Sequence, residues 1–328
     1  MKLYGKKHAV EMLGHFRSSG RFPHALLFYG PDGIGKHTLA DYTAMMYVCE
    51  NKSSAPCMTC GSCRKVLRHI HPDVLFPIPA IEEQFKKDKS SKSMVKMFRE
   101  FMAGCYIKPN DSETRVIVFE KLDKLSVLMQ NALLKFIEEP LEFNRYIFLA
   151  ENRAPILQTV LSRVTATEVG PADEEELTEA LAEHDIPAAR ARELYETFGG
   201  NIGAAVKYEK NGDELLYLRS ALAVCDALSE RKEYDCLRAF LSLKKREDIF
   251  SALGVISDIL ARAAAYKSGT PERVAYRKQT EKIASGFSLQ TIVRIYDEVN
   301  RLYGMSFTNP NVGLFAAECC GSIFSAIG

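Results

Sequence analysis

The segment GPDGIGKHTLA, Gly30 to Ala40, decides the fold expected for this chain of 328 residues. It begins with the pattern GxxxxGK, in which backbone N–H groups and one lysine bind nucleotide phosphates and a following Ser or Thr hydroxyl ligates Mg²⁺. The apolar run HALLFYG precedes the pattern, and apolar residues at helical spacing follow it. This order of strand, loop and helix predicts a phosphate-binding loop. The residues expected to bind phosphate are Gly30, Gly33, Gly35, Lys36 and Thr38.

Two further apolar segments predict strands of the same sheet. They are RVIVFE, Arg115 to Glu120, and RYIFLAEN, Arg145 to Asn152, and both are bounded by polar residues. Between them, SVLMQNALLKFIEEP predicts a helix that ends at Pro140. Strands that alternate with helices predict an α/β fold with a doubly wound parallel sheet and ligands at the carboxyl ends of its strands.

The composition is that of a globular protein. Hydrophobic residues make up 47% of the chain and charged residues 26%, and the net charge of +1 indicates neither a nucleic-acid nor a membrane partner. No stretch approaches the roughly 18 apolar residues of a membrane-spanning helix, and the N-terminus lacks the apolar stretch of a signal peptide. We therefore expect a cytoplasmic protein that contacts no membrane.

The pattern changes near Gly170, after which helical periodicity continues to the C-terminus. Three short helices come first, with breaks at Ile186–Pro187 and Gly199–Gly200. The sequence therefore predicts a phosphate-loop domain of residues 1–168, a small helical lid of residues 169–209 and an all-helical C-terminal domain of residues 210–328.

Four cysteines in a polar, turn-rich segment predict a metal site within residues 49–63. Their spacing is C-x7-C-x2-C-x2-C, and the ligands are Cys49, Cys57, Cys60 and Cys63. Four thiolates can surround one tetrahedral Zn²⁺ and leave no position for a catalytic water, so we expect structural zinc. The alternative of four buried structural thiols fits the polar segment poorly. The other cysteines are expected to be small core residues, and they are Cys105, Cys225, Cys236, Cys319 and Cys320.

Two positions needed for ATP hydrolysis hold unsuitable residues. His37 stands where a hydroxyl should ligate Mg²⁺, which prefers hard oxygen ligands, and Thr38 comes one residue too late. At the end of the second strand, Glu120 and Lys121 replace the acidic pair of an ATPase, and Lys121 cannot polarise an attacking water. Both losses together predict a site that does not hydrolyse ATP, and they leave ATP binding doubtful.

Taken together, the motifs resemble bacterial clamp-loader AAA+ subunits over essentially the whole chain. The resemblance rests on HALLFYGPDGIGKHTLA, the four-cysteine insert followed by HPDV, RVIVFEKLDKLSVLMQNALLKFIEEP, LSRV, and TNPNVGLFAAECC near the C-terminus. It implies a RecA-like AAA+ domain with a zinc insert, followed by a small helical lid and a helical collar through which subunits associate.

The resemblance also separates two classes of subunit. The tau/gamma subunits bind and hydrolyse ATP, whereas delta-prime subunits have a decayed nucleotide site and retain a serine–arginine motif. This chain is similar to the second class, with His37, Glu120 and Lys121 at the decayed positions and Gly203 where active subunits have a sensor arginine. Its motif departs from the family's Ser-Arg-Cys and reads Ser162–Arg163–Val164.

The function implied by the resemblance is that of a non-hydrolysing member of a ring with tau/gamma and delta subunits. The ring would help place the beta sliding clamp on primed DNA, as part of the DNA polymerase III holoenzyme, a nucleotidyltransferase. Arg163, with Ser162 as its motif partner, would be an arginine finger that stabilises charge in a neighbouring tau/gamma ATP site. By spacing alone, such an arginine is more often a solvated surface charge.

Two alternatives remain open. One is a self-sufficient ATPase of the tau/gamma type, in which Glu120 and Thr38 hold Mg²⁺ together. The other is a zinc-dependent DNA-binding module, which the small basic and aromatic content of the cysteine segment disfavours.

Overall fold

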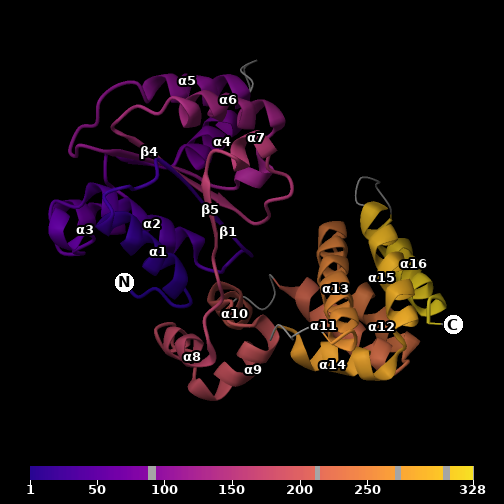
Figure 1. The fold of residues 1–328 in the computed structure, drawn as a ribbon. Helices are drawn as coiled ribbons and strands as arrows, with labels where there is room; N and C mark the ends of the chain where they lie inside the picture. The colour runs from indigo at the N-terminus through magenta and orange to yellow at the C-terminus, as the bar shows by residue number, and fades with distance from the viewer. Residues whose placement is uncertain (88–93, 211–214, 270–274, 306–310, 328) are drawn as a thin grey trace. The chain divides into compact units, whose positions relative to one another are not determined.

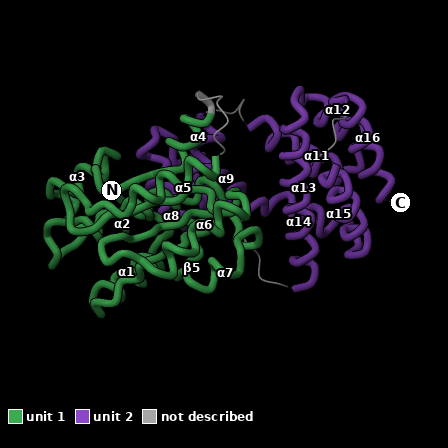
Figure 2. Tube along the Cα trace, turned by 90° about the horizontal axis from the view of Figure 1, so that it is seen from above, with its two compact units in different colours: residues 1–172 green, residues 173–328 purple. Residues whose placement is uncertain are grey.

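The computed structural model describes residues 1–87, 94–210, 215–269, 275–305 and 311–327. They form two compact units, residues 1–172 and residues 173–328 (Figure 2). The first unit contains both strands and helices, whereas the described part of the second contains helices. The three-domain division with boundaries after residues 168 and 209 stays a prediction.

The first unit is built around a five-stranded sheet. The strand order is β2-β3-β4-β1-β5, and every neighbouring pair is parallel, which confirms the predicted parallel α/β sheet. The predicted strands 24–30, 115–120 and 145–152 are the central strands β1, β3 and β4. In chain order the elements of this unit are α1 (Lys7–Ser18), β1 (Ala25–Tyr29), α2 (Lys36–Val48), η1 (Lys52–Ser54), α3 (Gly61–Leu67), β2 (Val74–Leu75), α4 (Pro77–Lys87), α5 (Met94–Gly104), β3 (Arg115–Phe119), η2 (Leu122–Lys124), α6 (Val127–Glu138), β4 (Asn144–Ala150), α7 (Gln158–Leu161) and β5 (Thr165–Glu168).

Helices cover both faces of the sheet (Figure 1). One face, which includes Phe28 and Val118, packs against buried residues of α1, α2 and α3. The opposite face, which includes Leu27 and Phe148, packs against residues of α4, α5, α6 and α7. The central strands are apolar throughout because both of their faces are buried. Because β3, β4 and β1 are parallel neighbours, their carboxyl ends lie at one edge of the sheet, where the phosphate loop begins.

The two edge strands fall outside the predicted segments because neither is a long apolar run. β5 reads TATE, and β2 has two residues. The segment before β2 is fixed by Asp73, which is fully buried. Its carboxylate accepts hydrogen bonds from the backbone N–H groups of Asn110 (2.6 Å), Asp111 (2.7 Å) and Ser112 (2.9 Å). These bonds lower the pKa of Asp73 despite its burial, so it is a charged anchor for the loop before β3.

The second unit has two hydrophobic cores. Its elements are α8 (Glu174–Ala182), α9 (Ala188–Phe198), α10 (Ile202–Lys210), α11 (Leu216–Ser229), α12 (Glu233–Leu241), α13 (Arg246–Lys267), α14 (Arg277–Gly286), α15 (Leu289–Gly304) and α16 (Val312–Ser325). The smaller core joins α8, α9 and α10 with the start of α11, and includes Leu177, Leu194 and Leu218. The larger core joins α11 to α16, and includes Leu253 and Phe315. The three short helices predicted after Gly170 correspond to α8, α9 and α10.

Helix α13 contradicts one expectation from the sequence. By length and composition alone, it is the one helix among the described residues that is long and apolar enough to cross a membrane. The expectation that no stretch approaches such a segment is therefore wrong. Its apolar side, including Ile249, Ile256 and Leu260, lies in the larger core of the unit.

The C-terminal segment TNPNVGLFAAECC contains the start of α16, while residues 308–310 lie outside the described part of the chain. The Asn311 side chain caps this helix by accepting hydrogen bonds from the N–H groups of Gly313 (3.1 Å) and Leu314 (3.2 Å). All of the cysteines expected in the core are buried, namely Cys105, Cys225, Cys236, Cys319 and Cys320.

Candidate functional site

The predicted phosphate-binding loop lies between β1 and α2, at the carboxyl end of a central strand. Gly33 and Gly35 have φ angles of 78° and 97°, in the left-handed region that favours glycine. The N–H of Gly30 donates to Ala150 O (3.1 Å), which joins the loop to the end of β4. Helix α2 begins directly at Lys36, and the predicted Thr38 lies exposed in its first turn.

Lys36 is turned back onto its own loop. Its Nζ donates to Gly30 O (2.7 Å) and Pro31 O (2.8 Å), and the residue is only 7% exposed. Burial lowers its pKa, and nearby carboxylates oppose this shift. In decreasing order of effect, these carboxylates are Asp32, Glu151 and Asp123. Burial therefore outweighs the carboxylates, and the two carbonyl bonds hold Lys36 Nζ against its own loop.

Sequence reasoning missed the role of Asp123, which follows β3. Its Oδ2 accepts hydrogen bonds from the N–H groups of Glu151 (3.2 Å) and Asn152 (3.3 Å), whereas Oδ1 is buried without a partner in the described structure. Lys124 pairs with Glu151. These contacts join the ends of β3 and β4. The signal for Asp123 was a second acidic residue three positions after Glu120 in FEKLD.

His37 and Glu120, the two residues at the predicted Mg²⁺ positions, contact each other. His37 Nδ1 lies 3.2 Å from Glu120 Oε1. Hydrogen bonding to Glu120 raises the pKa of His37, and the same contact lowers the pKa of Glu120. Lys121 is exposed and has a left-handed φ of 53°, which is costly for a residue with a side chain. The His37 imidazole thus compensates the negative charge of the Glu120 carboxylate.

A second pair lies next to the first. Asp41, one turn after His37 on α2, has its Oδ2 3.7 Å from His69 Nε2, beyond the end of α3. Burial raises the pKa of Asp41 to about 6, His69 and His37 oppose this effect, and Glu120 adds to it. The four groups join the start of α2, the end of β3 and the segment after the cysteines.

Arg163 and Ser162 directly follow α7, and their side chains contact each other. Arg163 Nη1 donates to Thr159 O (2.9 Å) and to Ser162 Oγ (3.1 Å). Arg163 Nε lies 2.8 Å from Glu138 Oε1, at the C-terminal end of α6. The Arg163 side chain is 40% exposed, so its guanidinium is held at one side and accessible to a partner.

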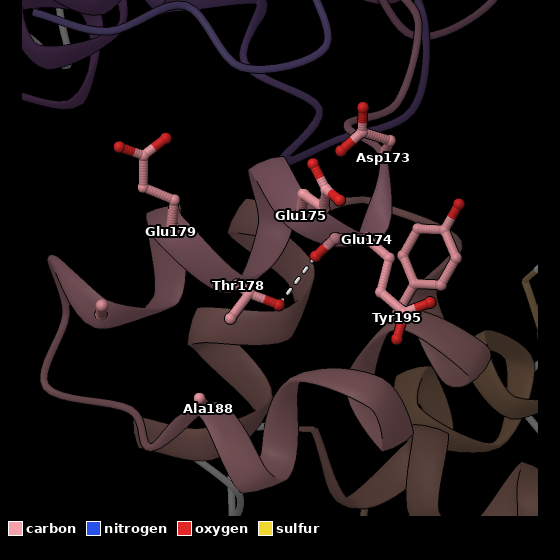
Figure 3. Close-up of a pocket in the computed structure, with 8 residues that line it drawn as sticks. Asp173, Glu174, Glu175, Thr178, Glu179, Ala188 and Tyr195 are labelled. Carbon is pink, nitrogen blue, oxygen red and sulfur yellow. Dashed lines mark hydrogen bonds between the residues drawn. The ribbon is translucent and has the colours of Figure 1, made fainter.

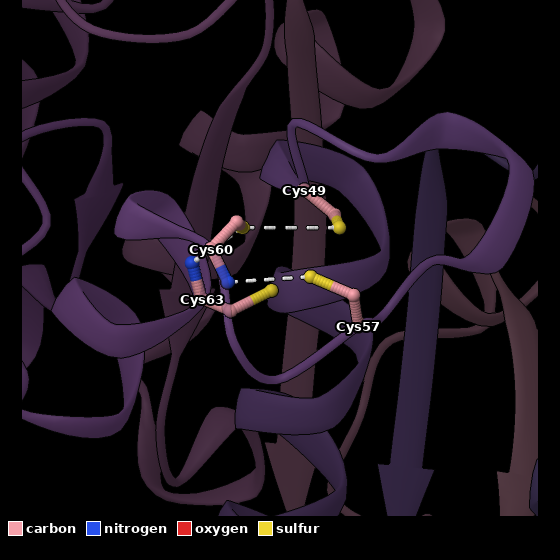
Figure 4. Close-up of side chains that lie close together, drawn as sticks. All are labelled: Cys49, Cys57, Cys60 and Cys63. Atoms are coloured by element: carbon pink, nitrogen blue, oxygen red, sulfur yellow. Dashed lines mark hydrogen bonds between the residues drawn. The ribbon is translucent and has the colours of Figure 1, made fainter.

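The four predicted cysteine ligands converge on one point (Figure 4). Their Sγ atoms all lie within 4.8 Å of one another, and Cys49 Sγ is 4.0 Å from Cys60 Sγ. Tetrahedral Zn²⁺ with Zn–S bonds of about 2.3 Å requires sulfur atoms about 3.8 Å apart, so the cluster has the correct size. The Cys60 N–H donates to Cys57 Sγ (3.3 Å) and the Cys63 N–H to Cys60 Sγ (3.4 Å). Such donors stabilise thiolates, the form that binds metal.

The helical unit has a separate acidic pocket between α8 and α9 (Figure 3). Its lining residues are Asp173, Glu174, Glu175, Thr178, Glu179, Ala182, Ala188 and Tyr195. Asp173 forms a capping box with Glu176, and the Thr178 hydroxyl donates to Glu174 O (2.7 Å). These contacts lie within α8 and stabilise its N-terminus. They point to no ligand, so we assign no chemistry to the pocket.

Comparison with known proteins finds relatives among the subunits of bacterial DNA polymerase III. DNA polymerase III subunit gamma of Buchnera aphidicola subsp. Acyrthosiphon pisum is 32% identical over 162 residues, which cover 49% of this chain and 42% of that protein. Subunit delta-prime of Bacillus subtilis is 25% identical over 225 residues, 68% of this chain and 65% of that protein. Subunit tau of Escherichia coli is 28% identical over 196 residues, 58% of this chain and 29% of that protein. The chain thus spans less than two thirds of each relative.

A family model described as "DNA polymerase III, delta subunit" matches residues 5–173, just over half of the chain. The matched residues include the phosphate loop, the four-cysteine cluster and the Ser162–Arg163 pair. The chain therefore belongs to this DNA polymerase III delta subunit family.

Proposed function

We propose that the chain is a delta-prime subunit of a bacterial DNA polymerase III clamp loader. In this proposal it is a cytoplasmic AAA+ subunit that does not hydrolyse ATP, and it joins tau/gamma and delta subunits in a ring. The ring loads the beta sliding clamp onto primed DNA. The C-terminal helices of residues 210–328 are its collar, and residues 169–209 are its lid.

The observation that carries the proposal is the contact between His37 and Glu120. In a hydrolytic loop these two positions supply oxygen ligands to Mg²⁺, either directly or through water. Here an imidazole and a carboxylate lie 3.2 Å apart and stabilise each other's charged form. Mg²⁺ would have to separate them without gaining a hydroxyl ligand.

The catalytic contribution of this subunit is then made at a neighbour's site. Arg163 is half-exposed, and two of its three guanidinium nitrogens have contacts within the subunit. We assign it the role of an arginine finger for the ATP of an adjacent tau/gamma subunit, with Ser162 as its positioning partner. There it would stabilise the charge on the γ-phosphate during hydrolysis.

The cysteine cluster is assigned to one structural Zn²⁺ held by Cys49, Cys57, Cys60 and Cys63. Four thiolates complete the tetrahedral coordination of zinc, so the ion would stabilise the fold of residues 49–63 rather than activate water. The close sulfur atoms and their N–H donors support this assignment.

The decisive experiment is the replacement Arg163→Ala in a clamp loader reconstituted with tau/gamma and delta subunits. An arginine finger accelerates hydrolysis by roughly 10³ to 10⁵, so the DNA-stimulated ATPase should lose the contribution of the site that Arg163 serves. Arg99→Ala, an exposed arginine on α5, is the matched control. The purified chain alone should show no ATPase activity. Equal turnover with and without Arg163 would contradict the finger assignment.

A self-sufficient ATPase of the tau/gamma type remains the second candidate. The relatives named gamma and tau and the complete GxxxxGK pattern favour it. Steady ATP hydrolysis by the isolated chain that Lys36→Ala abolishes would replace the first proposal with this one.

A further inference from the structure

Glu138 is the acidic residue that pairs with Arg163. It lies in the last turn of α6, and its Oε1 is 2.8 Å from Arg163 Nε. On the other side of the guanidinium, Nη1 donates to Thr159 O and Ser162 Oγ. These contacts use Nε and Nη1 of Arg163, and they leave Nη2 as the nitrogen for an acceptor outside the subunit.

Buried hydrogen bonds join α6, which carries Glu138, to the segment before α7, which leads to Arg163. Gln130 on α6 is 1% exposed, and its Nε2 donates to Leu125 O (3.0 Å) and Pro155 O (3.3 Å). Gln130 Oε1 accepts from the N–H of Leu157, the residue that precedes α7 (2.9 Å). Helices α6 and α7 also contact each other in the core beneath the sheet. The position of the Arg163 backbone relative to α6 is therefore fixed.

We propose that Glu138 is a positioning residue for Arg163, an inference that rests on the proposed arginine finger. An arginine side chain has a flexible stem and a planar group that donates in fixed directions. The pair to Glu138 restrains this group before the neighbour's γ-phosphate arrives, so less orientational freedom is lost at the moment of contact. Glu138 therefore acts on hydrolysis through the orientation of Arg163.

A second effect of Glu138 opposes the first. A carboxylate beside the finger weakens the positive potential that the phosphate meets. The Glu138 side chain is 45% exposed, so the high effective dielectric of the nearby solvent weakens this effect of its charge. Orientation depends on the direct 2.8 Å contact and is not screened in this way. We therefore expect orientation to dominate, and removal of the Glu138 charge to slow hydrolysis.

The test uses the reconstituted complex with Glu138→Gln, Arg163→Ala and the double variant, and measures kcat and KM for ATP. Glu139→Gln is the matched control, because Glu139 is exposed and directly follows Glu138 on the same helix end. Glu138→Gln should lower kcat on the order of tenfold at the affected site, as misplaced catalytic groups do, with KM unchanged. The double variant should be no slower than Arg163→Ala, since Glu138 has no effect without the finger. Because exposed ion pairs contribute little to folding, the thermal unfolding of Glu138→Gln should match the wild type.

The outcomes separate the two proposals. If Arg163→Ala slows hydrolysis and Glu138→Gln does not, the positioning role is overturned and the finger stands. An increase in kcat for Glu138→Gln would likewise overturn it, because Glu138 would then restrain the finger rather than orient it. A loss from Glu138→Gln of equal size in the Arg163→Ala background would show that Glu138 acts by another route. If Arg163→Ala has no effect, the proposed finger fails, and the positioning role fails with it.

Discussion

Replacement of Asp41 by asparagine is expected to stabilise the α/β unit at neutral pH and to lose this effect in acid. Burial raises the pKa of Asp41 from its ordinary value of 3.8 to about 6, although His69 and His37 attract its charge. Glu120 adds repulsion. The folded protein therefore holds a carboxylate that it would stabilise better in a neutral form, and asparagine has nearly the same shape without the charge.

The magnitude follows from the shift in pKa. A difference of about two pKa units corresponds to about 3 kcal/mol of folding free energy at pH values above the folded pKa. Asp41 is partly accessible to solvent, so we expect about half of this value, 1–2 kcal/mol. The sign of the pH dependence follows because a carboxyl group with a raised pKa binds its proton more tightly in the folded state than in the unfolded state. The cost of the Asp41 charge is thus absent below about pH 4, grows as the pH rises, and is complete above about pH 6.

The measurement is urea unfolding of wild type and Asp41→Asn at pH 4.5 and pH 7.5. Hydrogen-exchange mass spectrometry of peptides from β1 and β3 reports the α/β unit separately from the helical unit. The variant should exceed the wild type by about 1–2 kcal/mol at pH 7.5 and by clearly less at pH 4.5. Glu113→Gln, with an exposed side chain, is the control without such a pH-dependent gain. A gain of the same size at both pH values, or a loss at pH 7.5, would refute the reasoning.

Three further changes test other parts of the structure. The purified chain should contain one zinc ion, measured by elemental mass spectrometry, and Cys63→Ser should lose it and increase hydrogen exchange in residues 49–63. Asp73→Ala leaves three backbone N–H groups without their acceptor and should destabilise the α/β unit by about 3 kcal/mol or more in urea unfolding. The wild-type contribution of Asp73 should decline as the pH falls through its lowered pKa, so the difference between the two proteins should narrow in acid. Gln130→Leu should release the segment before α7 and lower the thermal midpoint by several degrees, a change that calorimetry detects.

The centre of the fold could be predicted because its signals are local. Strands β1, β3 and β4 are apolar runs, and the GxxxxGK pattern after the first of them specifies a loop and a helix. The edge strand β2 could not be predicted, since its position depends on Asp73 and on backbone groups of residues 110–112, far along the chain. The expectation that no stretch approaches a membrane-spanning segment failed for α13 because the core of a helical unit needs a long apolar helix, and length and composition do not distinguish a core helix from a membrane-spanning one.

From the sequence, the candidate site was predicted as separate positions that lack the residues needed for ATP hydrolysis. The structure adds the contacts between the residues that occupy these positions. His37 and Glu120 lie far apart in the sequence, and only the parallel sheet places the end of β3 beside the start of α2. Asp123 and Asp41 gave weaker signals, because single acidic residues in a charged chain are common. Glu138 stood at the end of a motif, and its contact with Arg163 depends on how α6 packs against α7.

The self-bonded phosphate loop has a consequence for how the proposed subunit would behave in a working ring. Lys36 Nζ donates to two carbonyls of its own loop, and a nucleotide phosphate would have to replace these bonds, which offsets part of the free energy that it gains there. A ligand shifts a conformational equilibrium only by its difference in affinity for the two states. We therefore expect this subunit to keep one shape at high and low ratios of ATP to ADP. Its ATP-binding neighbours would then change conformation relative to a subunit that does not, and their ATP binding and hydrolysis would set the rate of the cycle.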